Sequence, residues 1–327
     1  MSPKHLNFSK RLLKHAVFVL LFLLGILACN SNLNLNKEPE FSQIVSEDPS
    51  LLDEVEKVYF SDTTKASKSD NLTLASWNIR HLGRTKTPED IHQIATILRD
   101  FDIVAIQEVV AKDPAGAQAV AKIADELNRM GAKWDYQISD PTKSPSVYMS
   151  ERYAFLWKTS KVSLVHKAYL DRKLEDLCYR EPFVAIFKKK GKTEPFYVVN
   201  YHSRKYYDKP EEEIIHFIDY PKRLDSDRIL IAGDFNLSEK HAVWKPFYTK
   251  GFKSALQNQR TTLKVKCKDG DYLSHPIDNV YFTQGIDMVQ AGSIDLVTSC
   301  GNLERAREIS DHLPVYIEFK IAENEDF

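Results

Sequence analysis

The sequence predicts an α+β fold in which two packed β-sheets are flanked by helices. Two observations carry this prediction. Short runs of β-branched and aromatic residues recur along the chain between polar turns, and helical periodicity is confined to a few segments. Many strands with few helices are typical of a two-sheet core covered by helices. The 327 residues are 43% hydrophobic and 11% aromatic, which is enough for a sizeable core.

Eight segments are predicted to be strands and three to be helices. The strands, in chain order, are Leu72–Trp77, Ile103–Ile106, Tyr153–Trp157, Val184–Phe187, Phe196–Val199, Arg228–Ile231, Asn279–Phe282 and Val315–Phe319. The helices are Pro88–Arg99, Ala115–Met130 and Glu211–Tyr220. Thr87 is suited to the N-cap of the first helix, because Pro88 then takes the first helical position.

The N-terminus has the pattern of a signal peptide. Four Lys and Arg residues precede an apolar run over residues 16–27, and the small residue Ala28 stands directly before Cys29. The run has about 12 residues, short of the roughly 20 that span a bilayer. The segment resembles the bacterial lipobox, in which the cysteine is diacylated, although Leu27 is bulkier than usual there. An ordinary cleaved signal and a retained anchor are the alternatives.

These features predict three parts of the chain: a lipoprotein signal peptide over 1–28, a polar flexible tether over 29–70, and one catalytic domain over 71–327. Leu51–Phe60 is expected to form a short helix within the tether. Lipidation of Cys29 would anchor the protein to a membrane of the bacterial cell envelope, either in the periplasm or at the cell surface. We expect a monomer.

Cysteine usage and net charge narrow the possible sites further. With Cys29 lipidated, an oxidising compartment predicts one disulfide and one free thiol among Cys178, Cys267 and Cys300, with the pairing open. The sequence has no Cys-x-x-Cys pattern or matching histidine spacing, which argues against a zinc site. The formal net charge is -1, so any binding of a polyanion must be local.

Six of the predicted strands carry a polar cluster at one end. The clusters are Trp77–Arg80, Gln107–Glu108, Asn200–Ser203, Gly233–Asn236, Ile277–Asn279 and Ser310–His312. Turn and capping preferences account for any one of them alone. They do not account for the repeated grouping of carboxylate, carboxamide and imidazole. These groups are the hard oxygen ligands of Mg²⁺ or Ca²⁺ together with groups that transfer protons, so the joint pattern predicts a catalytic edge.

The same residues resemble the ordered motifs of the endonuclease/exonuclease/phosphatase superfamily. The resemblance covers about residues 72 to 320, and Ser150–Trp157 with Arg180–Val184 resemble the DNase I branch in particular. It implies a four-layer α/β/β/α sandwich, in which two mixed sheets are flanked by helices, and metal-dependent cleavage of phosphate esters.

Residue by residue, the resemblance also implies a metal site. Glu108 would be the main ligand of Mg²⁺, with Asn78 and Asp311 around the same ion, and Mn²⁺ or Ca²⁺ are the alternative ions. Asp234 and Asn236 would hold a second ion, or the attacking water and the scissile phosphate.

The proton-transfer groups follow from the same resemblance. Glu151 would orient His202, and Asp278 would orient His312, so that each imidazole is held by a carboxylate. Arg180 would contact phosphate through its planar guanidinium group. The alternative for Arg180 is a surface salt bridge to Glu181 or Asp176.

The substrate is predicted to be nucleic acid, with DNA favoured over RNA. Basic residues on segments that lead to the catalytic edge could follow a phosphate backbone: Arg80, Arg84, Lys86, Lys143, Arg152, Arg204 and Lys205. Two features of the DNase I branch are missing, because Val110 replaces an arginine and Leu237–Ser238 replaces a cysteine.

Two other functions compete with the nuclease. A sphingomyelinase, another phospholipid phosphodiesterase or an inositol-phosphate phosphatase would use most of the same motifs. The sequence shows no second apolar insertion and no evident aromatic hairpin that would enter lipid. A non-catalytic lipoprotein that binds ligands at the surface is disfavoured, because every acid, amide and imidazole of the motifs is present.

Overall fold

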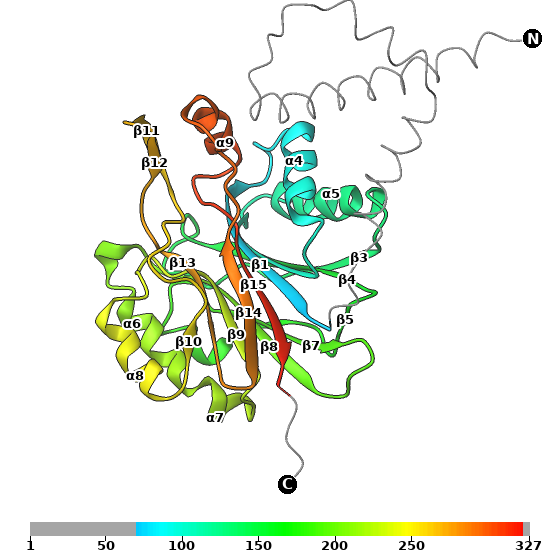
Figure 1. Ribbon diagram of the computed structural model, residues 1–327, viewed down its shortest axis with the longest axis vertical. Helices are drawn as coiled ribbons and strands as arrows, with labels where there is room; N and C mark the ends of the chain where they lie inside the picture. The colour runs from blue at the N-terminus through cyan, green and yellow to red at the C-terminus, as the bar shows by residue number, and fades with distance from the viewer. Residues whose placement is uncertain (1–69, 323–327) are drawn as a thin grey trace, which may run out of the picture. The chain divides into compact units, whose positions relative to one another are not determined.

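A computed structural model describes residues 70–322 (Figure 1). The predicted signal peptide, the lipidation site Cys29 and the predicted helix Leu51–Phe60 lie outside the described residues. Among the helices of residues 70–322, none combines the length and the apolar composition that crossing a membrane requires.

Two mixed β-sheets form the centre of the described chain. The first has the order β14 (Ile286–Ser293), β15 (Val315–Ile321), β1 (Leu72–Leu82), β2 (Ile103–Val110), β4 (Glu151–Lys158) and β3 (Trp134–Ile138). The second has the order β10 (Lys253–Ser254), β13 (Asp278–Phe282), β9 (Ile229–Asp234), β8 (Pro195–His202), β7 (Phe183–Lys189) and β5 (Val162–Leu164), with β6 (Tyr169–Leu170) also paired to β7. Each sheet contains one parallel pair, β1 with β2 and β8 with β9.

Three apolar clusters define the four layers, which confirms the predicted fold. The cluster between the sheets includes Phe155 and Phe183, whose rings stack with centroids 5.2 Å apart. A second cluster packs α4 (Pro88–Leu98) and α5 (Ala115–Arg129) on the outer face of the first sheet. A third packs α6 (Glu211–Ile214), α7 (Tyr220–Leu224) and α8 (Lys245–Thr249) on the second sheet (Figure 1).

The helix predictions are confirmed for two segments and corrected for the third. Thr87 caps α4 as expected: its hydroxyl accepts from the Asp90 amide, and the Asp90 carboxylate accepts from the Thr87 amide. The segment predicted as one helix from Glu211 instead contains α6, a 3₁₀ turn over Ile215–Asp219, and α7. Pro221 explains the break, because it has no amide hydrogen to continue a helix through this point.

A small hairpin and a short helix form an appendage beside the sheets. The hairpin pairs β11 (Leu263–Lys268) with β12 (Asp271–Leu273), and its apolar residues pack with those of α9 (Leu303–Ile309). Cys267 and Cys300 form a disulfide that joins the two parts, and Cys178 is free and buried. The expectation of one bridge and one free thiol is therefore confirmed, and its pairing is now assigned.

A buried polar contact joins the two sheets. The Asn200 amide on β8 donates to the carbonyl oxygens of Ile106 at 3.0 Å and Ala154 at 3.1 Å, on β2 and β4 of the other sheet. Its own carbonyl oxygen accepts from Gln107 Nε2 at 2.7 Å. Because a buried amide is costly to leave unpaired, these bonds fix how β8 sits against β2 and β4.

Candidate active site

Three side chains of the site form one row across the second sheet. His202 ends β8, Asp234 ends β9 and Asp278 begins β13, and the strand register places both His202 and Asp278 directly beside Asp234. Neighbours in register project from the same face of a sheet. Gly233 permits the close pairing here, because an added Cβ would lie 1.8 Å from the Tyr201 carbonyl oxygen.

Two carboxylate–imidazole pairs converge on Asp234. His202 Nδ1 lies 3.0 and 3.1 Å from the two Glu151 oxygens, and His312 Nδ1 lies 2.9 and 3.0 Å from those of Asp278. The opposite ring nitrogens both face Asp234 Oδ2, with Nε2 of His202 at 3.5 Å and Nε2 of His312 at 3.7 Å. The structure thus brings together both predicted pairs around a shared carboxylate.

The electrostatic surroundings favour protonated imidazoles. Burial lowers the pKa of His312, but the Asp278 and Asp234 carboxylates outweigh this effect and raise it to about 10. Burial and the Arg180 guanidinium lower the pKa of His202, and Glu151 with Asp234 raise it above its ordinary value. Each carboxylate that orients a ring therefore also stabilises its charged form.

Glu108 reaches the site through a β-bulge. It has φ of +60°, and the register of β2 against β4 shifts between Ile106 and Val109, on either side of it. Its carboxylate accepts from Asn78 Nδ2 and from the His81 amide, both at 3.1 Å. Burial would raise the pKa of Glu108, but the charge of nearby His202 and these hydrogen bonds lower it to about 2.

The Asn78 side chain fits a role as a cation ligand. The side-chain nitrogen Nδ2 donates to Glu108 and, at 3.2 Å, to Asp234. The side-chain oxygen Oδ1 is buried and has no hydrogen-bond partner among residues 70–322. A buried oxygen with no partner beside an ionised carboxylate suits a hard cation such as Mg²⁺. Asp234, Asp278 and His312 form another group that could hold a metal, with ligand atoms within 4.8 Å of one another.

Asp311, the third predicted ligand, contacts two arginines rather than Glu108 or Asn78. Its carboxylate is 3.9 Å from Arg80 Nη1 and 3.8 Å from Arg307 Nη2, and its side chain is about one-third exposed. The metal role of Asp311 therefore stays a prediction. Asn236 lies in the cleft with φ of +50°, and its backbone amide donates to Asp234 Oδ1 at 2.9 Å.

Arg180 is buried at the wall of the site, so its alternative interpretation as a surface salt bridge is wrong. Its guanidinium donates to the carbonyl oxygens of His202 at 3.0 Å, of Met149 at 3.5 Å and of Ser203, and it lies 3.7 Å from Glu151. These contacts tie the residues after β8 to those before β4. Arg180 also lines the cleft, where its predicted contact with phosphate stays untested.

A cleft of about 790 Å³ contains the convergent groups. It is lined by Glu108, Glu151, Arg180, His202, Asp234, Asn236 and His312, together with residues of the surrounding loops. The cleft therefore presents carboxylates, two imidazoles and a carboxamide to one volume, which is the set of groups that hydrolysis of a phosphate ester needs.

Comparison with known proteins identifies the class of this site. The sequence profile of the Endonuclease/Exonuclease/phosphatase family matches residues 75–312, which include all six motifs. The chain belongs to this family. Membership supports phosphodiesterase or nuclease activity in general, and it agrees with a cluster of residues that could bind a metal.

Relatives within the family are named as deoxyribonucleases. A deoxyribonuclease of Thioalkalivibrio sp. (strain K90mix) is 31% identical over 277 residues, which are 76% of this chain and 71% of the relative. Deoxyribonuclease-1-like 1 of Sus scrofa is 28% identical over 279 residues, 79% of this chain and 84% of the relative.

Solved structures agree on the fold. A family protein from Bacteroides vulgatus matches with a TM-score of 0.55 at 16% identity and covers 77% of this chain and 99% of its own. A family protein from Bacteroides thetaiotaomicron matches with a TM-score of 0.55 at 17% identity and covers 77% and 98%. At these identities the likeness shows the fold alone.

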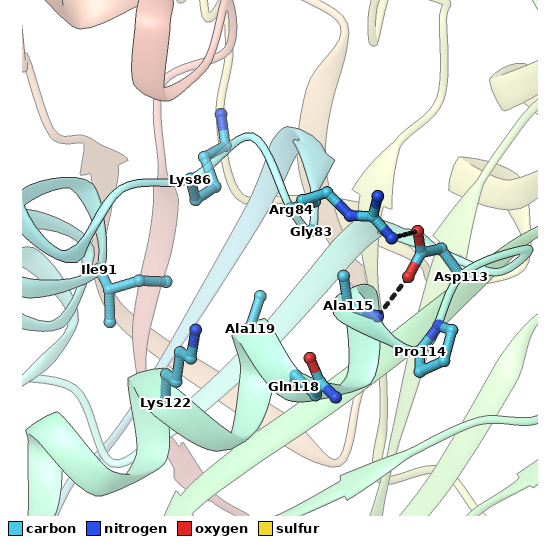
Figure 2. A pocket seen from close by; sticks show the side chains of 10 residues that line it. All are labelled: Gly83, Arg84, Lys86, Ile91, Asp113, Pro114, Ala115, Gln118, Ala119 and Lys122. Carbon is cyan, nitrogen blue, oxygen red and sulfur yellow. Dashed lines mark hydrogen bonds and ion pairs between the residues drawn. The ribbon is translucent and has the colours of Figure 1, made fainter.

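A second, smaller hollow lies beside the loops that precede α4 and α5. The hollow has a volume of about 320 Å³ and is lined by residues of α4, α5 and the loops before them (Figure 2). Arg84 Nη2 lies 2.6 Å from Asp113 Oδ2, and the other oxygen of that carboxylate accepts from the Ala115 amide at 2.8 Å (Figure 2). These contacts connect the loop after β1 to the start of α5.

Most of the basic residues that are predicted to follow a phosphate backbone also contact groups of their own chain. The contacts are those of Arg84 with Asp113, Lys86 with the Glu308 and Ile309 carbonyls, Lys143 with Asp176, Arg152 with the Ser139 carbonyl, and Arg204 with Glu213. Lys205 lines the cleft. The contact of these basic residues with a phosphate backbone stays a prediction.

Two supporting hydroxyl groups were given no role from the sequence. Thr261 Oγ1 donates to Asp278 Oδ2 at 2.6 Å and so helps to fix the carboxylate that orients His312. Ser310 Oγ donates to the backbone carbonyl oxygen of Asn78 at 2.6 Å and accepts from the His312 backbone amide at 3.1 Å. Ser310 belonged to a predicted motif without a role of its own, and its spacing from His312 was the available signal.

Proposed function

We propose that this chain is a Mg²⁺-dependent phosphodiester hydrolase that acts as a nuclease on extracytoplasmic DNA, with RNA as a further substrate. One observation carries the proposal: two carboxylate-backed imidazoles face the same Asp234 oxygen at 3.5 and 3.7 Å, beside the Asn78–Glu108 pair. The relatives named as deoxyribonucleases favour DNA among phosphodiesters.

Glu108 and Asn78 would hold the cation, with Asp311 as the third expected ligand and Mn²⁺ or Ca²⁺ as alternatives. A bound divalent cation would supply charge neutralisation on the phosphate oxygens. The low pKa of Glu108, about 2, keeps its carboxylate ionised and ready to bind a cation at neutral pH.

The two imidazoles divide the movement of protons. Water attacks phosphorus, and its proton passes to Nε2 of one imidazole, which must be in its neutral form for this step; the bond from phosphorus to the leaving oxygen breaks, and that oxygen takes a proton from Nε2 of the other imidazole, which is protonated. Nδ1 of each ring stays bound to its own carboxylate, Glu151 for His202 and Asp278 for His312. This arrangement leaves Nε2 of each ring to exchange the proton.

The remaining predicted residues position the reactants. Asp234 and Asn236 would hold the attacking water and the scissile phosphate at the centre of the cleft, where Asp234 lies between the imidazoles. Arg180 and Arg80 would contact phosphate through their guanidinium groups. A charged group that already has a fixed place lowers the reorganisation that the reaction requires.

The location of the enzyme is proposed from the N-terminal sequence. Cys29 would carry lipid and anchor a monomeric enzyme to a membrane of the bacterial cell envelope, facing the periplasm or the outside. A Cys29→Ser protein should leave the membrane fraction of cells. If it sedimented with membranes as the natural chain does, the lipid anchor would be wrong.

Substrate assays with matched variants test the proposed function. The purified protein is incubated with plasmid DNA, RNA, sphingomyelin vesicles and bis-nitrophenyl phosphate, with Mg²⁺, Mn²⁺, Ca²⁺ or EDTA. We expect cleavage of DNA that EDTA stops. His202→Ala and His312→Ala should each lower turnover by about 10²- to 10⁴-fold, while His166→Ala, at an exposed position, serves as the control.

Three outcomes would contradict the proposal. Unchanged turnover in His202→Ala would remove the proposed proton-transfer role. Cleavage of sphingomyelin without cleavage of nucleic acid would replace the substrate. Binding of DNA with no hydrolysis under any metal would favour the non-catalytic surface protein.

A further inference from the structure

Exposed aromatic side chains gather at the rim of the cleft. Among residues 70–322, five large apolar side chains are at least 70% exposed, and four of them line this one cleft: Val147 at 70%, Tyr148 at 84%, Tyr206 at 72% and Tyr207 at 74%. The fifth, Val265, lies on β11. We call Tyr148, Tyr206 and Tyr207 the rim tyrosines. A concentration of exposed rings at one site marks a surface for binding.

The rim tyrosines flank the catalytic groups from two segments of the chain. Tyr148 lies in the loop before β4, three residues before Glu151. Tyr206 and Tyr207 begin a 3₁₀ turn over Tyr206–Asp208, and Tyr206 follows His202 by four residues. Both segments therefore lead directly from a member of the same carboxylate–imidazole pair, so a molecule that contacts the rings reaches the reacting groups.

Lysines stand beside two of the rings. Lys112 Nζ lies 5.4 Å from the ring centroid of Tyr148, and Lys205 Nζ lies 5.9 Å from that of Tyr207. Neither lysine takes part in an ion pair within the described part of the chain, and both line the cleft. Asp208 is the acidic residue of this rim. Rings alternate with cations here, which matches a ligand that alternates flat bases with phosphates.

From this arrangement we infer that the rim tyrosines stack on unpaired bases next to the scissile phosphate. The inference rests on the proposed nuclease function and deepens it by naming the substrate class, single-stranded or locally melted nucleic acid in preference to duplex. In a duplex the faces of the bases are stacked on one another, and only an unpaired base offers its face to a ring. Lys112 and Lys205 would meet the neighbouring phosphates.

The rim tyrosines also bear on the lipid alternative. The sequence showed no evident aromatic hairpin, yet the folded chain exposes two tyrosine segments at the cleft. A lipid surface is the competing ligand for such rings. Nucleic acid is favoured over lipid by three features: the tyrosine hydroxyls, the lysines beside the rings, and the relatives named as deoxyribonucleases. Binding to lipid vesicles is therefore measured as a separate arm of the test.

Binding without turnover tests the inference independently of catalysis. With Mg²⁺ present, and with His202→Ala in every protein to suppress turnover, fluorescence anisotropy compares a labelled single-stranded oligonucleotide with its duplex, for the otherwise natural chain, for the added double change Tyr206→Ala/Tyr207→Ala, and for added Tyr148→Ala. The control is Tyr136→Ala, a tyrosine on the edge strand β3 that does not line this cleft. Each rim variant should weaken binding of the single strand by about 5- to 160-fold per stacked base lost, with a smaller effect on the duplex.

Cleavage with Mg²⁺ then separates failure of the inference from failure of the function. If DNA is cleaved but the rim variants cleave and bind both forms as Tyr136→Ala does, the inference is wrong and the nuclease stands. If no nucleic acid is cleaved, the function fails, and the anisotropy still decides whether the rings bind single strands. Loss of binding to phosphatidylcholine vesicles without loss of binding to oligonucleotides would overturn the inference in favour of lipid.

Discussion

Replacement of Asn200 by leucine should damage both stability and catalysis, because this side chain joins the two sheets behind the site. The change removes three hydrogen bonds, to the Ile106 and Ala154 carbonyls and from Gln107 Nε2. Leucine has the same number and branching of side-chain heavy atoms and leaves no large cavity, so the loss reflects mainly these bonds. At about 1 kcal/mol each, the free energy of unfolding should fall by about 3 kcal/mol.

Catalysis should fall as well because His202 follows Asn200 by two residues on β8, while its partner Glu151 begins β4. Without the contact to Ala154, the two strands can shift relative to each other. A misplacement of about 1 Å can cost on the order of 10²-fold in rate, so we expect kcat/KM for DNA to fall by about 10- to 100-fold.

Thr283→Val is the matched control for this effect. Thr283 Oγ1 is buried, accepts from the Ile229 amide at 2.9 Å and donates to the Asp227 carbonyl. Thr283 follows the last residue of β13, whereas Asp278 is the first residue of that strand. The Thr283→Val substitution should lower the free energy of unfolding by about 1 to 2 kcal/mol and leave kcat/KM unchanged. Urea unfolding and initial rates measure both variants. A loss below about 1 kcal/mol in Asn200→Leu, or a kcat/KM equal to that of Thr283→Val, would refute the reasoning.

Two further predictions concern charge and covalent linkage. In the metal-free protein the pKa of His312 is raised from its ordinary value of 6.5 to about 10. The charged ring therefore stabilises the fold fully below about pH 6.5, and this stabilisation is lost as pH rises through about 10. With EDTA, urea unfolding should therefore show falling stability between pH 7 and 10, and Asp278→Asn should flatten that slope; equal slopes would contradict the assignment. The Cys267–Cys300 bridge closes a loop with a sequence separation of 33 residues, so Cys267→Ser/Cys300→Ser should lose about 3.7 kcal/mol of unfolding free energy on a chain-entropy basis. An unchanged urea midpoint would show that the bridge does not constrain the unfolded chain.

The sequence predicted the parts of the site that depend on local pattern. Polar clusters at the ends of apolar runs located His202, Asp234 and Asp278 at strand ends, and the register then placed them in one row. Such clusters are informative because β-branched runs mark the strands and the ends of neighbouring strands lie at one edge of the sheet. The two carboxylate–imidazole pairs came from the resemblance, and the distances agree with them.

The parts that depend on distant contacts could not be predicted. The bulge at Glu108 arises from pairing of β2 with β1 and β4, and no local preference of a glutamate indicates φ of +60°. Thr261 lies 17 residues before Asp278 and meets it only because the chain returns to the site. Strands such as β6 and β10 have two residues each, too few for a periodic pattern.

The balance of charge explains why a nearly neutral chain can still act on a polyanion. The residues around the two imidazoles include four carboxylates, Glu108, Glu151, Asp234 and Asp278, against at most three cations, His202, His312 and Arg180. A phosphodiester that entered this group alone would be repelled. A divalent cation held by Glu108 and Asn78 would reverse the sign of the local charge, so we expect binding of the metal to precede binding of the scissile phosphate. The -1 formal charge of the whole chain is therefore no obstacle, because the attraction acts at the site.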